Sequence, residues 1–317
     1  MANIEPPITL EEQVIQMKKY VVFRQRKKMR EFLNYAGYFR ASRYGKFLLS
    51  RVGVTGAKSK QDTLFALYKF DVELRRILNF YCNRTEVRFK SALSNACSIK
   101  LSSGTFYLDK QSYTPSQGEK DAKKRKHNIA FFNNYLYKDI LEKEAKLRQD
   151  VRKYPELKEY RKGGNRQKNK LPVWVAFSYF ELGTVTMMYN YLRGDLRKVI
   201  LAYSFAKTAY AKRDTEIMDT WLDAVRNLRN YCAHNSMLVG MTSSVVLLDS
   251  NDDAALLQAD NDLFSRIYAL KKLVPADDVD NIKNDIKKLI KKTPIDVYLL
   301  GILPSNWEEI YDKIVEF

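Results

Sequence analysis

Histidine is scarce in this chain of 317 residues, which contains only His127 and His234. The three cysteines, Cys82, Cys97 and Cys232, are too few and too far apart for a disulfide framework or a zinc site. A catalytic metal would therefore need carboxylate ligands, and no paired-carboxylate spacing stands out in the sequence. We expect no metal ion and no other cofactor.

Glycine and proline are also rare, with 12 and 8 residues, whereas aromatic residues make up 13% of the chain. This balance favours long helices over a turn-rich β architecture, so we expect an all-α fold. No apolar run reaches the roughly 18 residues of a membrane-spanning helix, and no hydrophobic segment follows the first residues. We therefore expect a reduced, cytoplasmic protein without a membrane partner.

Positive charge is what the chain has in excess: the formal net charge is +18 and the isoelectric point is about 9.6. Lysine and arginine side chains that neutralise phosphates release counterions, so this charge predicts a polyanionic partner. Charge alone does not choose between RNA, DNA and anionic lipid. A basic amphipathic helix expected over residues 282–292 is compatible with a membrane surface, or with Ile282, Ile286 and Leu289 packed inward.

Three basic segments are candidates for an RNA-binding surface. In residues 38–47 basic side chains alternate with aromatic ones, a composition that can stack bases and hold phosphates. Two lysine-rich and arginine-rich runs bracket a helical stretch further along the chain. The candidate RNA-binding residues are Arg40, Arg43, Lys123, Lys124, Arg125, Lys126, Arg161, Lys162, Arg166 and Lys168. The same segments are compatible with aromatics in the core and with charges that are merely solvated.

Residues 229–234 (RNYCAH) place one of the two histidines at the end of a polar stripe. On a helix, Asn230 and His234 are one turn apart and can touch, and Arg229 lies beside them. Asp219, Asp223, Arg226 and Asn227 continue the polar stripe, whereas Trp221, Val225, Leu228 and Cys232 occupy the opposite side. The pattern fits RNA phosphodiester chemistry, and it also fits a histidine that caps a helix end near the dipole.

Residues 228–235 resemble the Arg-x4-His signature of HEPN-superfamily ribonucleases, in the form carried by Abi-like abortive-infection proteins of the AbiD/AbiF type. Further stretches resemble the same family in the same order, at residues 6–13, 37–44, 67–76, 86–88, 171–174, 181–183 and 301–307. The chain departs from the family after the histidine, where Asn235 and Ser236 replace the usual arginine and aromatic. The segment between Gly104 and Lys170 is longer and more basic than a minimal member requires.

The resemblance implies an all-α protein with a HEPN-like helical bundle over about residues 61–245, carrying a basic insertion over about 104–170. Residues 1–60 and 246–317 would form helical extensions. It further implies a metal-independent endoribonuclease of a prokaryotic phage-defence or toxin-type system, with Arg229, Asn230 and His234 as catalytic residues. One histidine cannot easily perform both proton transfers, so the resemblance implies a homodimer. The alternative is a non-catalytic RNA-binding protein that holds a structured regulatory RNA.

Two further expectations concern helices. Apolar residues recur at spacings of three and four from Phe65 to Leu101, which is too long for an ordinary helix unless it forms the spine of the bundle. Another helix is expected over about residues 255–273. Glu86 and Arg88 on the long helix are candidates either for support of the active site or for a surface or interhelix ion pair.

Overall fold

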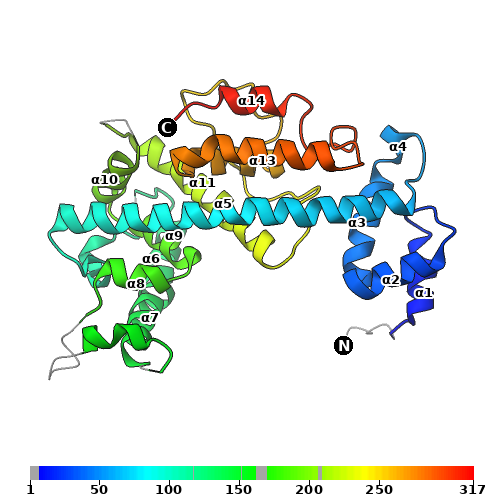
Figure 1. Ribbon diagram of the computed structural model, residues 1–317. Coiled ribbons are helices and arrows are strands. Elements are labelled where there is room, and N and C mark those ends of the chain that lie inside the picture. The colour runs from blue at the N-terminus through cyan, green and yellow to red at the C-terminus, as the bar shows by residue number, and fades with distance from the viewer. Residues whose placement is uncertain (1–6, 117, 151, 162–169, 206–208) are drawn as a thin grey trace.

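The computed structural model describes residues 7–116, 118–150, 152–161, 170–205 and 209–317. Within these ranges every regular element is a helix, and strand-like pairing is limited to two isolated bridges, Val22 with Lys60 and Tyr113 with Leu192. Figure 1 shows the arrangement. The helices are α1 (Leu10–Met17), α2 (Arg26–Ala36), α3 (Tyr38–Ser50), α4 (Val52–Thr55), α5 (Gln61–Leu101), α6 (Ala122–Phe131), α7 (Tyr137–Gln149), α8 (Val173–Tyr179), α9 (Leu182–Tyr191), α10 (Gly194–Ser204), α11 (Lys212–Ala233), α12 (Leu263–Leu273), α13 (Val279–Lys292) and α14 (Trp307–Lys313). The all-α expectation is confirmed.

Helix α5 is the spine of the molecule. Its 41 residues form one uninterrupted helix, which at 1.5 Å per residue spans roughly 60 Å. Helices α3, α8, α10, α11, α12 and α13 all pack against it. The alternative in which this stretch is one helix that forms the spine is therefore correct, because neighbours cover it along most of its length and supply the burial that an isolated helix lacks.

The other helices gather around α5 in three places (Figure 1). Helices α1 to α3 lie below its N-terminal end in this view, and α6 to α9 lie below its C-terminal end. Helices α13 and α14 cover its upper side. Helix α11 crosses α5 and ends below it, between the two lower groups. The end of α11, where the histidine motif stands, therefore lies near the middle of the spine.

A single cluster of buried apolar side chains runs from Val14 in α1 to Phe317 at the end of the chain. The C-terminal segment takes part through Phe317, whose ring lies 4.6 Å from that of Trp221 in α11. The division into residues 1–60, 61–245 and 246–317 stays a prediction. In α13, Ile282 and Ile286 are buried and Leu289 is partly buried against the core, as the inward-packing alternative requires.

The helix expected over about residues 255–273 begins later than predicted. Helix α12 starts at Leu263, and the side chain of Asp262 caps it by accepting a hydrogen bond from the Ser265 N–H at 2.8 Å. The preceding residues instead form a loop that pairs with its own beginning, since the Ser243 N–H donates to the Asn261 carbonyl at 2.9 Å. The apolar residues of the loop recur at helical spacing, but the cap at Asp262 sets the start of α12 at Leu263.

A buried ion pair joins α5 to the loop that follows α11. Arg75 and Asp71, one turn apart on α5, form a salt bridge with side chains almost inaccessible to solvent. The Tyr44 hydroxyl from α3 donates to Asp71 at 2.5 Å. The other carboxylate oxygen accepts the N–H groups of Leu238 and Val239 at 3.0 and 2.9 Å. Burial raises the pKa of the Asp71 carboxyl, and Arg75 acts in the opposite direction.

Replacing Asp71 with Ala should destabilise the protein strongly, because the Arg75 guanidinium would stay buried without a counter-ion and two N–H groups would lose their acceptor. We expect the free energy of unfolding, measured by urea denaturation, to fall by about 3–5 kcal/mol. The matched control is Arg76→Ala, which breaks an exposed pair with Glu73 on the same helix and should cost less than about 1 kcal/mol. Equal losses in the two variants would contradict the role given to Asp71.

Candidate active site at the end of α11

Helix α11 has the two faces that its sequence predicts. Trp221, Val225, Leu228 and Cys232 are buried. Their burial fixes the rotation of the helix and therefore turns the opposite, polar stripe away from the core. The polar stripe is the surface on which the candidate catalytic residues stand.

The first half of the polar stripe is occupied by structural contacts. Asp219 accepts a hydrogen bond from the buried guanidinium of Arg197 at 2.5 Å, and burial raises the pKa of Asp219 to about 6. Asp223 forms an ion pair with Arg226 and accepts from the Ser244 hydroxyl at 2.5 Å. These carboxylates therefore hold α11 to α10 and to the following loop.

The second half of the stripe is free of such contacts. His234 is the C-terminal cap of α11: its backbone N–H donates to the Asn230 carbonyl at 2.9 Å, and its side chain is exposed. Within the described residues no hydrogen bond or ion pair engages the side chain of His234 or that of Asn230, nor do the two bond to each other. The structure thus brings the two residues one turn apart on the surface.

The turn after His234 is formed by Asn235 and Ser236, the two positions at which the sequence departs from the resembled pattern. Asn235 has a φ of 52°, in the left-handed region where asparagine is one of the better tolerated residues. Its N–H donates to the Cys232 carbonyl and the Ser236 N–H donates to the Tyr231 carbonyl at 2.8 Å. This is a Schellman turn. Arg75 donates to the Ser236 carbonyl at 3.3 Å, so the turn is tied to the buried ion pair on α5.

Arg229 lies beside the stripe and faces α5. Its Nε atom is 3.8 Å from Oε2 of Glu86. The second oxygen of Glu86 pairs with Lys90 at 2.6 Å, and Lys90 also donates to the Phe180 carbonyl at 2.5 Å. Glu86 therefore pairs with Lys90 on its own helix and with Arg229 of α11, so the interhelix ion pair considered for it is present.

Arg88 has a different role from its neighbour Glu86. It donates to the carbonyls of Leu273, Val274 and Ser204 at 2.6 to 2.9 Å. Two of these groups belong to the C-terminal end of α12, where carbonyls lack partners within the helix. Arg88 therefore joins helices rather than supporting the candidate site.

The chemistry available at the end of α11 is that of an imidazole and a guanidinium. An imidazole can exchange protons at neutral pH, and a guanidinium can stabilise negative charge on phosphate oxygens. The nearby thiol of Cys232 is a poor nucleophile, because burial raises its pKa to about 12. No group of three or more His, Cys, Asp or Glu side chains in the described ranges is arranged to hold a metal ion.

The candidate RNA-binding residues fall into two groups. Lys123, Lys124, Arg125 and Lys126 are exposed in the first turns of α6, where the Asp121 side chain caps the helix by accepting the N–H groups of Lys123 and Lys124. His127 is exposed beside them. Arg161 ends the short helical turn Pro155–Arg161. Lys162, Arg166 and Lys168 lie outside the described residues.

The second group lies at the other end of the spine. Arg43 is exposed and Arg40 half-buried on α3, next to Phe39, whose side chain is 77% exposed. Figure 1 shows α3 and α6 near opposite ends of α5, on the side where α11 ends. The two basic groups therefore flank the candidate catalytic residues at a distance, and only an extended or structured nucleic acid would reach both.

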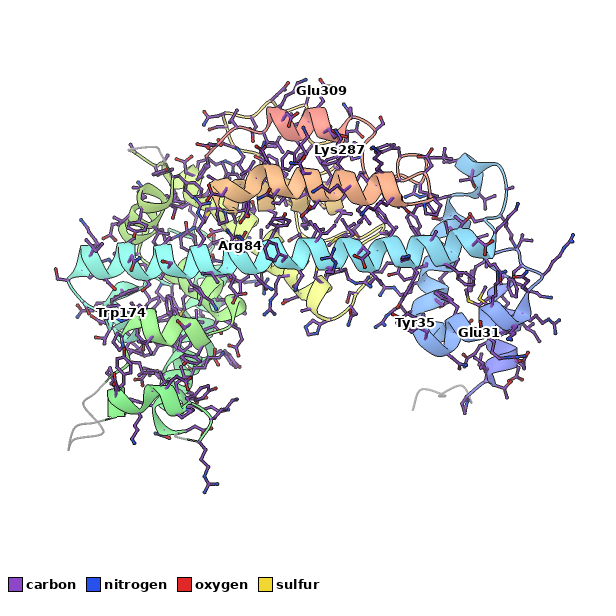
Figure 2. All side chains as sticks on the ribbon, viewed as in Figure 1. Glu31, Tyr35, Arg84, Trp174, Lys287 and Glu309 are labelled. Atoms are coloured by element: carbon purple, nitrogen blue, oxygen red, sulfur yellow. The ribbon has the colours of Figure 1, made fainter. Side chains whose placement is uncertain are left out.

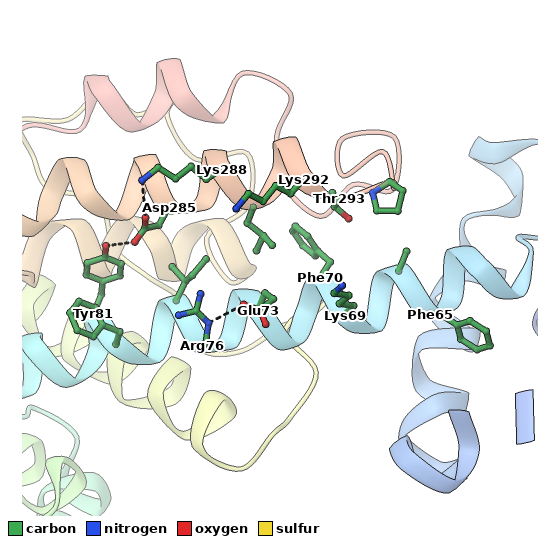
Figure 3. Close-up of a pocket in the computed structure, with 15 residues that line it drawn as sticks. Phe65, Lys69, Phe70, Glu73, Arg76, Tyr81, Asp285, Lys288, Lys292 and Thr293 are labelled. Atoms are coloured by element: carbon green, nitrogen blue, oxygen red, sulfur yellow. Dashed lines mark hydrogen bonds and ion pairs between the residues drawn. The ribbon is translucent and has the colours of Figure 1, made fainter. Parts of the chain in front are cut away.

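Two cavities lie along α5. One, of about 560 Å³, is lined by residues of α5 and α8 and has Arg229 on its wall. A larger one, of about 950 Å³, lies between α5 and α13 and is shown in Figure 3. Lys69, Arg76, Lys288 and Lys292 surround the larger cavity, but none of the predicted catalytic or RNA-binding residues lines it. The smaller cavity is the one that adjoins the candidate site.

The sequence matches the family model described as Abi-like protein over residues 31–239. The chain belongs to the Abi-like protein family. The matched region includes α3, α5 and α11, and so both the buried ion pair and the histidine motif. Searches of curated proteins and of solved structures give no match. No helix in the described part of the chain has the length and apolarity required to cross a membrane.

Sequence reasoning missed the residues that position the site. Tyr44, Asp71 and Arg75 lie in stretches that carry the family resemblance, but no role was predicted for them. Their partners are Ser236, Leu238 and Val239, more than 160 positions away from Asp71 and Arg75. The available signal was an aspartate and an arginine one turn apart within an otherwise apolar face of a long helix.

The two halves of the polar stripe should respond differently to mutation. Asp219→Ala would leave the buried Arg197 guanidinium without its carboxylate and should lower the free energy of unfolding by about 3 kcal/mol. His234→Ala removes an exposed side chain without hydrogen bonds and should change the free energy of unfolding by less than about 0.5 kcal/mol. Thermal and urea denaturation measure both. A large destabilisation by His234→Ala would make the histidine a structural helix cap.

Proposed function

We propose that this protein is a HEPN-type endoribonuclease that acts in abortive infection, as a phage-defence or toxin-type enzyme on RNA in the cytoplasm. Its membership of the Abi-like family supports the link to abortive infection. The observation that carries the proposal is the side chain of His234. It is exposed at the end of a well-packed helix, yet the turn around it is held by backbone hydrogen bonds and by Arg75.

The proposed reaction is attack of a ribose 2′-OH on the adjacent phosphorus. A base removes the 2′ proton, and an acid gives a proton to the departing 5′ oxygen. The products are a 2′,3′-cyclic phosphate and a 5′-hydroxyl end. His234 would act as the base or the acid. Arg229 would stabilise the charge that develops on the phosphorane oxygens. Asn230 would orient either the imidazole or the phosphate.

The nucleophile in this reaction belongs to the RNA itself, so no metal-bound water has to be generated. Metal independence follows from the proposed chemistry and is tested with EDTA. If EDTA abolished cleavage, a metal-dependent reaction would replace this proposal.

A homodimer is part of the proposal, because one imidazole supplies one of the two proton transfers. Two copies of α11 that approach with their C-terminal ends would place two histidines at one phosphate. HEPN ribonucleases pair two such motifs across a twofold axis. The exposure of His234 is compatible with this contact, since no part of the described chain covers it.

The second candidate function is a non-catalytic RNA-binding protein that holds a structured regulatory RNA. The separation of the basic groups on α3 and α6, at opposite ends of α5, favours it. A structured RNA could contact both groups at once, whereas a short single strand could not. Binding and cleavage are compatible with each other, and the experiment below separates them.

Replacing His234 with Ala should abolish RNA cleavage while leaving RNA affinity unchanged, because the imidazole is proposed to move protons and not to supply binding energy. Cleavage of labelled RNA is measured by gel electrophoresis, with and without EDTA, and affinity by filter binding. Cleavage by the variant at the wild-type rate would contradict a catalytic role. A wild-type protein that binds tightly but never cuts would support the RNA-holding function.

The proposed homodimer leads to a second prediction for His234→Ala. In a mixture with wild type, heterodimers carry one histidine, and each lost proton-transfer group costs about 10²–10⁴ in rate. At equal amounts of the two chains, activity should fall to roughly a quarter, the fraction of wild-type homodimers. A fall to only one half, linear in the mutant fraction, would indicate sites that work independently.

Neutralising Lys123, Lys124, Arg125 and Lys126 to Gln should weaken RNA binding without moving the cleavage positions. If all four contact phosphates, the slope of log affinity against log salt should become shallower by roughly 3. The control is the same change at Lys287, Lys288, Lys291 and Lys292 of α13, which removes the same charge from another helix. Equal effects of the two variants would show that net charge, and not the α6 surface, determines binding.

A further inference from the structure

The smaller cavity lies directly beside Arg229. Its walls come from α5, through residues between Asn83 and Asn95, and from α8, through Trp174, Phe177 and Ser178. Arg229 of α11 also lines it. Its volume of about 560 Å³ lies within the range of roughly 300–1,000 Å³ typical of small-ligand sites.

Trp174 is held in place and yet exposed. Its side chain is 53% exposed, and Figure 2 labels it below the C-terminal part of α5. One edge of the indole packs on Gly104 so closely that a Cβ atom there would lie 2.9 Å from Cη2 of Trp174. The Val173 N–H also donates to the Gly104 carbonyl at 2.7 Å. A large aromatic ring is therefore fixed at the cavity with much of its surface uncovered.

Polar groups on the α5 wall are available to a ligand. Asn83 is exposed, and its amide has no hydrogen-bond partner among the described residues. Ser94 also lines the cavity, but its hydroxyl oxygen is closed to solvent. The cavity thus combines a stacking surface, unpaired donors and acceptors, and a guanidinium.

We propose that this cavity binds an unpaired nucleobase of the RNA, with the base stacked on Trp174 and the neighbouring phosphate at Arg229. The inference rests on the proposed function, because it places the base next to the phosphate that would be cut. A base within a duplex has both faces covered by its neighbours, so a stacking site of this kind selects single-stranded or looped RNA. Asn83 would contact the edge of the base and favour some bases over others.

The fluorescence of the protein allows a direct test. Trp221 and Trp307 are fully buried, so Trp174 is the exposed member of the three tryptophans. The protein carrying His234→Ala is titrated with a six-nucleotide oligoadenylate and with an abasic oligonucleotide of the same length. We expect saturable quenching by the oligoadenylate and binding at least about tenfold weaker for the abasic strand. Equal affinity for both strands would overturn the proposal.

Three variants in the same background complete the test, and their affinities are measured by filter binding because two of them lack the exposed tryptophan. Trp174→Ala should weaken oligoadenylate binding about tenfold, whereas Trp174→Phe should retain most of the affinity because a ring remains. Tyr35→Ala is the matched control, since Tyr35 is an exposed aromatic of α2 at the other end of α5 (Figure 2), and it should leave affinity unchanged. Unchanged affinity in Trp174→Ala would overturn the stacking role.

These experiments test the ribonuclease proposal and the base-binding proposal independently. Titrations with the His234→Ala protein do not depend on catalysis, so quenching without any cleavage by the wild type would reject the ribonuclease and keep the base-binding cavity. Cleavage by the wild type with no discrimination against the abasic strand would keep the ribonuclease and reject the cavity. Circular dichroism of Trp174→Ala, with Trp174→Phe as reference, shows whether a loss of affinity reflects a loss of fold.

Discussion

The buried pair of Asp71 and Arg75 is the interaction on which the candidate site depends. It joins α3 through the Tyr44 hydroxyl, and it joins the loop after α11 through the N–H groups of Leu238 and Val239. Removing either charge would leave the other one buried without a partner, which costs far more than the pair itself contributes. The loop after His234 therefore cannot shift without breaking an arrangement that three segments share. The backbone next to the exposed His234 is in this way held in place by buried residues.

Helix α11 shows which polar residues the fold uses and which it leaves free. Asp219 and Asp223 contribute carboxylates to ion pairs that hold neighbouring segments, so the fold explains their presence. Asn230 and His234 make no such contacts in the described structure, although they continue the same stripe. Arg229 is intermediate between these two groups. Its Nε atom lies 3.8 Å from Glu86, whereas Lys90 forms the shorter ion pair with the same carboxylate at 2.6 Å. A guanidinium held loosely at a cavity wall can turn to a phosphate at little cost.

Much of the fold was predictable because it depends on patterns among residues that are close together in the sequence. The apolar spacing of α5 and the two faces of α11 follow from helical periodicity, and the low glycine and proline content indicated an all-α protein. The start of α12 was missed because one cap at Asp262 outweighs a continuing apolar pattern. Of the candidate site, the motif on α11 could be found from sequence, but its anchor could not. Asp71 and its backbone partners are far apart in the chain, and nothing in the local sequence indicates that they meet. The exposure of Trp174 depends on Gly104 and is equally non-local.

The positions of Trp174, Arg229 and His234 also constrain the proposed reaction. Arg229 and His234 are five residues apart on one helix, more than a full turn, so a phosphate held by the guanidinium lies to one side of the imidazole. A base stacked on Trp174 would extend the strand along α5 and present its phosphate to Arg229 from the cavity side. The scissile phosphate could then lie between Arg229 of one protomer and the imidazoles at the ends of two α11 helices. In this arrangement the base-binding cavity determines the register of the strand, and the dimer contact completes the proton-transfer pair.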